Sequence, residues 1–99
     1  MNDKNAQNEI LQKAAEYYGF KHQLLKLIEE LGELSREAVK ILLGEGDKEH
    51  FAEECADVDI LLDQIAFFMP LNPLRMQEYR EQKIERLKQR IEQEGGGEL

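Results

Sequence analysis

Residues 27–65, LIEELGELSREAVKILLGEGDKEHFAEECADVDILLDQI, contain two helical patterns separated by a turn with two glycines. Apolar residues recur every three or four positions on both sides of this turn, which is the spacing of one face of an α-helix. Sustained alternation of polar and apolar residues, the pattern of a strand, is missing. Gly44 suits the left-handed conformation that often caps the C-terminus of an α-helix, and Asp47 suits a helix N-cap. The stretch therefore predicts an antiparallel helical hairpin.

The same periodicity continues outward from the hairpin in both directions. Gly19 separates it from an earlier helical segment, and Pro70 ends the second helix of the hairpin. Asn72 is a suitable N-cap for a last helix that has Pro73 at its first position. The predicted fold class is all-α, a four-helix bundle in a single domain over residues 1–94, followed by a flexible Gly-rich tail at 95–99. The expected helices span residues 4–18, 22–43, 48–69 and 73–94.

The composition is that of an acidic chain. Its 99 residues include 21 Asp and Glu against 13 Lys and Arg, giving a formal charge of -8. Binding to nucleic acids or to anionic membranes needs clustered Lys and Arg, so neither partner is expected. No apolar run is long enough to span a membrane. Cys55 is the only cysteine, which excludes an internal disulfide and favours a cytoplasmic location; its place on an apolar seam predicts a core residue.

The carboxylates of the third predicted helix divide into two groups. At about 100° per residue, Glu54 projects from the middle of the apolar stripe and Asp57 lies about 60° to one side. A carboxylate on an apolar face costs several kcal/mol unless something satisfies it. The remaining acids point the opposite way and are expected to be solvated: Glu49, Asp59 and Asp63.

The second predicted helix supplies a possible counterpart. Gln23, Lys26, Glu30, Glu33 and Glu37 form a stripe along one flank of its apolar seam, with Glu33 and Glu37 expected further from that seam than Glu30. Antiparallel packing of the hairpin would bring Glu30 and Glu33 to face Glu54 and Asp57. Four such carboxylates would suit Mg²⁺ or Mn²⁺, which prefer oxygen ligands. The alternative is that each acidic motif is an ordinary solvated helix face.

The pattern Glu29-Glu30-x-x-Glu33 followed by Glu54-x-x-Asp57 resembles the MazG family. These are all-α nucleoside triphosphate pyrophosphohydrolases, related to dimeric dUTPases and dCTP pyrophosphatases, and the resemblance covers about residues 20–69. It implies a MazG-like helical bundle completed by oligomerisation. It also implies that Glu30, Glu33, Glu54 and Asp57 hold Mg²⁺. Water would then attack the α-phosphorus of a bound NTP or dNTP, releasing a nucleoside monophosphate and pyrophosphate.

The resemblance suggests roles for further residues. Glu29 or Glu53 would position the attacking water, and nothing in the sequence chooses between them. Lys26, Lys83 and Arg86 are candidate donors to the phosphate oxygens, with surface ion pairing as the alternative for the last two. Gln23 is a candidate nucleotide contact, for which solvation on the helix surface is the alternative.

Two functions follow from these observations. The first is nucleotide-pool cleaning by a Mg²⁺-dependent pyrophosphohydrolase. The alternative is a non-enzymatic helical dimerisation or adaptor module with a vestigial acidic patch, and a regulatory nucleotide-binding protein lies between them. Apolar residues, including Leu25, Ile28 and Val39, span more than half of the circumference of the second predicted helix. One partner helix cannot cover that much surface, so we expect a homodimer or a dimer of dimers.

Overall fold

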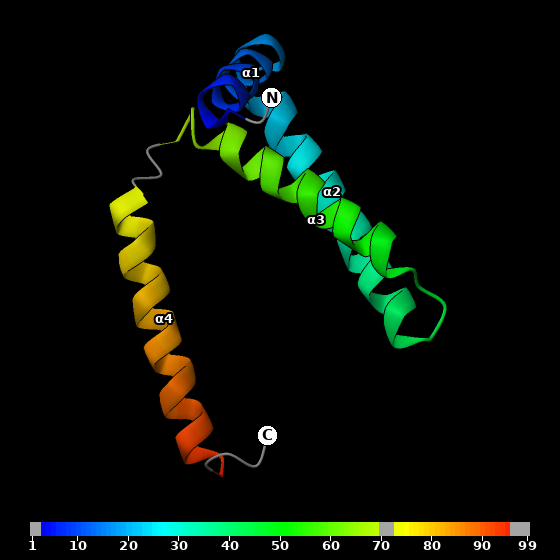
Figure 1. Cartoon of the computed structure of the whole chain (residues 1–99), viewed down its shortest axis with the longest axis vertical. Coiled ribbons are helices and arrows are strands. Elements are labelled where there is room, and N and C mark those ends of the chain that lie inside the picture. Colours follow the sequence, from blue (N-terminus) through cyan, green and yellow to red (C-terminus); the bar gives the residue numbers. More distant parts are fainter. Residues whose placement is uncertain (1–2, 70–72, 96–99) are drawn as a thin grey trace. The chain divides into compact units, whose positions relative to one another are not determined.

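A computed structural model describes residues 3–69 and 73–95, which form four α-helices and no strand (Figure 1). The helices are α1 (Lys4–Tyr18), α2 (Phe20–Leu42), α3 (Lys48–Ile65) and α4 (Pro73–Gln93). This confirms the predicted all-α class. The chain divides into two compact units, Met1–Met69 with α1 to α3 and Pro70–Leu99 with α4. The predictions for Pro70, for Asn72 as an N-cap and for the tail beyond Gly95 lie outside the described residues.

The turn between α2 and α3 has the predicted caps. Gly44 takes a left-handed conformation with φ of 77°. Its N–H donates to Ile41 O, and the N–H of Glu45 donates to Lys40 O at 2.9 Å, which together satisfy two carbonyls at the end of α2. The Asp47 carboxylate then accepts from the N–H of Glu49 at 2.9 Å and caps α3.

The start of α2 follows α1 after a single residue. Gly19 has φ of 87° and ψ of 161°, and its N–H donates to Ala15 O at 2.8 Å. Glycine adopts this positive φ without the steric cost that a Cβ would add. The chain therefore changes direction sharply between the two helices, and α1 contacts both α2 and α3.

The end of α3 differs from the prediction, which extended this helix to Met69. The helix ends at Ile65 and continues as a tighter turn. In this turn the N–H of Phe67 donates to Gln64 O and that of Phe68 donates to Ile65 O, both three residues back. Such i→i+3 bonds commonly tighten a last helical turn, and hydrophobic periodicity does not distinguish them from α-helix.

The core lies along the antiparallel pair α2 and α3, which Figure 1 shows side by side. The buried apolar side chains in the described part of the chain are Ala15, Leu27, Val58, Leu61 and Ile65. Three polar side chains are buried with them: Gln23, Glu37 and Gln64. The predicted place of Cys55 in the core is wrong, because Cys55 is exposed and the buried stripe of α3 runs through Val58, Leu61 and Ile65.

The second unit consists of a solvated helix with local pairs along its length. Arg75 donates to Tyr79 Oη at 2.8 Å, and Gln77 donates to Glu81 four residues on. The apolar seam of α4 is exposed: Ile84, Leu87 and Ile91. None of the four helices, as far as the structure describes them, is long and apolar enough to cross a membrane.

Candidate metal and substrate site

Three carboxylates from the two long helices of the first unit lie close together. Glu30 on α2 and Glu54 and Asp57 on α3 each offer an oxygen, and these oxygens all lie within 4.8 Å of one another. Glu30 and Glu54 are half-buried, whereas Asp57 is exposed. The cluster forms because the antiparallel packing of α2 and α3 brings the second turn of α3 opposite the middle of α2. The sequence predicted all three of these residues as metal ligands.

Glu54 is the most constrained member of the cluster. Its Oε2 atom is buried and has no hydrogen-bond partner. Burial raises the pKa of Glu54 above its ordinary value of 4.5, and so do a hydrogen bond with Glu30 and the negative charges of Glu30, Asp57 and Glu37. Each of these causes disfavours the ionised carboxylate. A cation at this point would remove both the unsatisfied oxygen and the repulsion.

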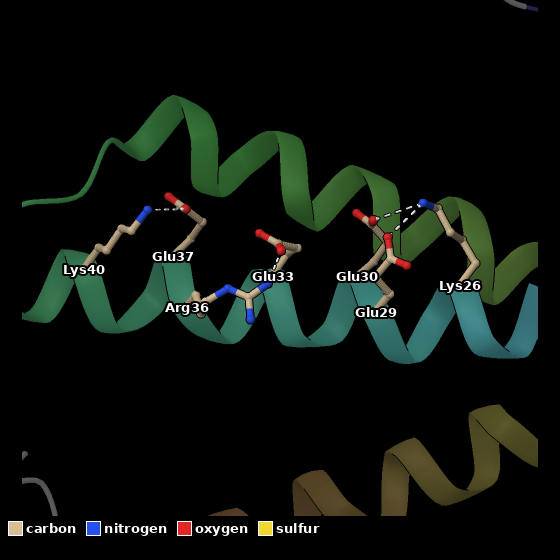
Figure 2. Close-up of polar contacts among 7 residues, drawn as sticks. All are labelled: Lys26, Glu29, Glu30, Glu33, Arg36, Glu37 and Lys40. Atoms are coloured by element: carbon tan, nitrogen blue, oxygen red, sulfur yellow. Dashed lines mark hydrogen bonds and ion pairs between the residues drawn. The ribbon is translucent and has the colours of Figure 1, made fainter.

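Glu37 approaches the same region from α2. Its side chain is buried, and its carboxylate lies 3.2 Å from Lys40 Nζ (Figure 2). The same carboxylate lies 3.8 Å from His50 Nδ1. The sequence prediction placed Glu37 further from the apolar seam, which is wrong. The line of contact with α3 runs along Leu27, Glu30, Leu34 and Glu37 at alternating spacings of three and four, so Glu37 lies beneath the first turn of α3.

Glu33, the fourth predicted ligand, lies outside the group of three carboxylates. Its carboxylate pairs with the Arg36 guanidinium on the surface of α2, and 41% of its side chain is exposed (Figure 2). Glu33 follows Glu30 by three residues, which turns its side chain about 60° away from that of Glu30. An exposed pair of this kind contributes little to stability.

Lys26 brings a positive charge to the edge of the cluster. Its Nζ lies 3.0 Å from Glu29 and 3.8 Å from Glu30, as the dashed lines in Figure 2 mark. The hydrogen bond and charge of Glu29 raise the pKa of Lys26, so its ammonium stays protonated at neutral pH. The cluster therefore has an ammonium next to Glu29 and Glu30.

A hollow of about 620 Å³ opens beside the carboxylates. Its charged lining residues are Lys26, Glu29, Glu30 and Asp57. The rest of its wall combines aromatic, apolar and amide groups: Tyr18, His22, Gln23, Ile60, Leu61 and Gln64. The rings of Tyr18 and His22 are stacked, with centroids 4.9 Å apart. A pocket with a few polar groups on an apolar wall is typical of small-molecule sites.

The amide groups of this pocket form a chain across the helix pair. Gln23 Nε2 donates to Gln64 Oε1 at 2.6 Å, and Gln23 Oε1 lies 2.7 Å from His22 Nδ1, where the Nδ1–H tautomer donates to it. Both glutamines are buried, so the solvated alternative for Gln23 is wrong. Sequence reasoning missed Gln64 altogether. Its spacing of three residues from Leu61 was the available signal.

The other predicted site residues are exposed. Glu53 lies on α3 beside Glu54 in the sequence, and its side chain points to solvent. Lys83 and Arg86 lie on the exposed surface of α4, in the second unit. Arg86 lines a shallow hollow on that helix with Glu81, Gln82, Glu85 and Gln89.

Comparisons of the chain with family models, curated proteins and solved structures find no match. The functional argument therefore depends on the arrangement of the side chains. The carboxylate cluster, its unsatisfied oxygen and the adjoining pocket together form the candidate site.

Proposed function

We propose that the chain is a Mg²⁺-dependent nucleoside triphosphate pyrophosphohydrolase that cleaves NTP or dNTP between the α and β phosphates. The products are a nucleoside monophosphate and pyrophosphate, and the role is cytoplasmic nucleotide-pool cleaning. The observation that carries the proposal is the cluster of Glu30, Glu54 and Asp57 within 4.8 Å, of which Glu30 and Asp57 also line a pocket. The resemblance of the Glu29-to-Asp57 pattern to the MazG family supplies the reaction type.

The residues fit a divalent cation on two grounds. The donors are all carboxylate oxygens, the ligands that Mg²⁺ and Mn²⁺ prefer. In addition, Glu54 Oε2 is buried without a partner, so one ligand position is already desolvated and unsatisfied. When bound, Mg²⁺ supplies charge neutralisation of the phosphates and lowers the pKa of a coordinated water.

The protein's own side chains would bind and orient the substrate. Lys26 lines the pocket beside Glu29, where its ammonium can donate to phosphate oxygens. Glu29, 3.0 Å from Lys26, or the exposed Glu53 would accept a proton from the attacking water. The wall formed by Tyr18, His22 and Gln23 offers a stacking surface and an amide for the nucleoside.

A second candidate, the helical dimerisation or adaptor module, is favoured by the exposed apolar side chains. Leu42 is 85% exposed and Ile28 is 60% exposed on α2, far more apolar surface than a small folded chain usually leaves uncovered. This surface is equally compatible with the enzyme, which we propose acts as a homodimer or a dimer of dimers. The two candidates differ in whether the carboxylates serve chemistry.

Pyrophosphate release from a panel of canonical and modified NTPs and dNTPs, with Mg²⁺ or Mn²⁺, tests the proposal. We expect turnover with at least one substrate, and loss of most of that turnover in Glu54→Gln. Asp59→Asn is the matched control, because it removes an exposed carboxylate from the same helix. Absence of turnover with every substrate, or full turnover by Glu54→Gln, would refute the enzymatic function.

A further inference from the structure

The outer side of α2 carries a seam that the other helices of the first unit leave exposed. We define this outer seam as the residues that follow one another at alternating spacings of three and four: Leu25, Ile28, Gly32, Ser35, Val39 and Leu42. Its four large apolar side chains are exposed by 58%, 60%, 51% and 85% for Leu25, Ile28, Val39 and Leu42. At about 100° per residue the outer seam lies opposite the stripe that packs on α3. A long apolar stripe on one face of a helix normally packs against another element.

The outer seam has the same spacing and the same order of small and large residues in both directions. About a point between Glu33 and Leu34, Gly32 corresponds to Ser35, Ile28 to Val39, and Leu25 to Leu42. Two small residues thus occupy the centre, and larger apolar residues follow on each side. A two-fold axis at this point would place each residue of one copy against its counterpart in a second copy, which is the requirement of a symmetric homodimer interface.

The charged residues beside the outer seam have the matching arrangement. Glu29 and Arg36 flank it on the same side, and both side chains are largely exposed, by 62% and 63%. In an antiparallel pair of α2 helices, this flank faces the same flank of the partner subunit. Glu29 would then lie near Arg36 of the partner subunit, and Arg36 near Glu29 of the partner subunit. A parallel pair would place this flank against the other one, which holds the apolar residues Leu24, Leu31 and Ala38. The charges therefore favour the antiparallel pairing.

The centre of the outer seam allows a close approach of two helices. A Cβ built on Gly32 meets nothing within 4 Å, so this glycine is not needed for packing inside the chain. Glycine within a helix is otherwise unfavourable compared with alanine. Small residues at a crossing point let two helix backbones come near one another, and Gly32 and Ser35 supply them here.

We propose that a second copy of this chain covers the outer seam, with the two α2 helices antiparallel about a two-fold axis between Glu33 and Leu34. This specifies the homodimer that we propose above and does not depend on the enzymatic activity. Because α3 occupies the opposite side of α2, the carboxylate cluster lies on the far side of that helix from the seam. Each α2 is then enclosed between its own α3 and the α2 of the partner subunit.

Sedimentation equilibrium of the full chain and of single variants tests the surface. We expect a dimer, and a rise in its dissociation constant of at least about a hundredfold in Ile28→Glu, because symmetry places the new carboxylate at two contacts with Val39. Ile10→Glu is the control, since Ile10 is 65% exposed on α1. A monomeric wild type, or a dimer unaffected by Ile28→Glu, would overturn the proposal whatever the outcome of the pyrophosphate assay.

Thiol cross-linking tests the register. In a Cys55→Ser background we expect the double variant Ile28→Cys/Val39→Cys to form disulfide-linked dimers on oxidation. The single variants are expected to stay uncrosslinked, because two copies of position 28 lie about 16 Å apart along the helix axis. Efficient cross-linking of Ile28→Cys alone would show a parallel or shifted pairing, and a double variant that does not cross-link would show another surface; either result overturns the proposal.

Discussion

Glu54→Gln is the substitution that separates a metal site from a patch of surface acids. Without divalent cations we expect the variant to be more stable than the wild type at pH 7.5. The reason is that glutamine removes a charge that burial, Glu30, Asp57 and Glu37 all disfavour, while keeping the side-chain shape. With Mg²⁺ the order should reverse, because the variant has lost one of three carboxylate ligands. Thermal unfolding at one fixed protein concentration measures both effects.

The size of the metal effect follows from mass action. At a Mg²⁺ concentration one hundred times the dissociation constant, the wild type gains about 2.7 kcal/mol, which for a chain of this length corresponds to a rise in Tm of roughly 10 °C or more. If loss of the Glu54 ligand weakens binding about a hundredfold, the gain at the same Mg²⁺ concentration falls to about 0.4 kcal/mol. The difference between the two proteins is well within the resolution of calorimetry.

The control for this experiment is Asp59→Asn. It removes one carboxylate from the exposed side of α3 and leaves the three clustered carboxylates intact. We expect Mg²⁺ to stabilise Asp59→Asn as much as the wild type. Equal stabilisation of all three proteins would mean that Mg²⁺ acts by general charge screening, and the assignment of Glu54 as a ligand would be refuted.

Three further expectations follow from the described contacts. In chelator, the stability advantage of Glu54→Gln over the wild type should grow as the pH rises from about 4 to 7. The pKa of Glu54 is raised in the folded protein, so the cost of ionising it in the folded state appears only above the unfolded value of 4.5. A pH-independent difference between the two free energies of unfolding in urea would contradict this cause. Gln64→Leu should lower the free energy of unfolding by about 1–3 kcal/mol, because it leaves the buried Gln23 amide without its acceptor. In urea titrations, Gln23→Leu/Gln64→Leu should lose less stability than the sum of the two single variants. Simple additivity would show that the two amides do not interact. Gly46→Ala should lower the free energy of unfolding by about 1–3 kcal/mol, because the new Cβ would lie 2.6 Å from Ile41 Cγ1 and 2.7 Å from Ile41 N. Unchanged thermal stability would show that the turn relaxes freely.

The helices and their caps could be predicted from local sequence because their causes are local. Gly44 and Asp47 act within a few residues of themselves, through a left-handed backbone and a carboxylate cap. The inward position of Glu54 was also predictable, since it depends only on the phase of the apolar stripe of α3. The end of α3 was not, because hydrophobic spacing is the same in an α-helix and in the tighter turn that follows Ile65.

The rest of the site depends on how two helices cross, which periodicity does not specify. Glu33 and Glu37 lie on one flank of α2 and are equivalent in spacing, yet the crossing with α3 buries Glu37 and leaves Glu33 paired with Arg36. Gln23 similarly looks like a surface residue until Gln64, on the opposing helix, is known to accept its hydrogen bond. Pairs of this kind are separated by many residues and belong to the register of packing.

The two faces of α2 differ in a way that links the site to the proposed dimer. The face toward α3 holds Gln23, Glu30 and Glu37, so the helix pair that should form the core contains polar groups whose burial costs free energy. Few apolar residues of the unit are buried to offset that cost. The outer seam, in contrast, is apolar and exposed, and its burial against a second copy would contribute the missing stability. On this reasoning, assembly would allow the inner face of α2 to be used for carboxylates and amides, and separating the two copies would weaken the site.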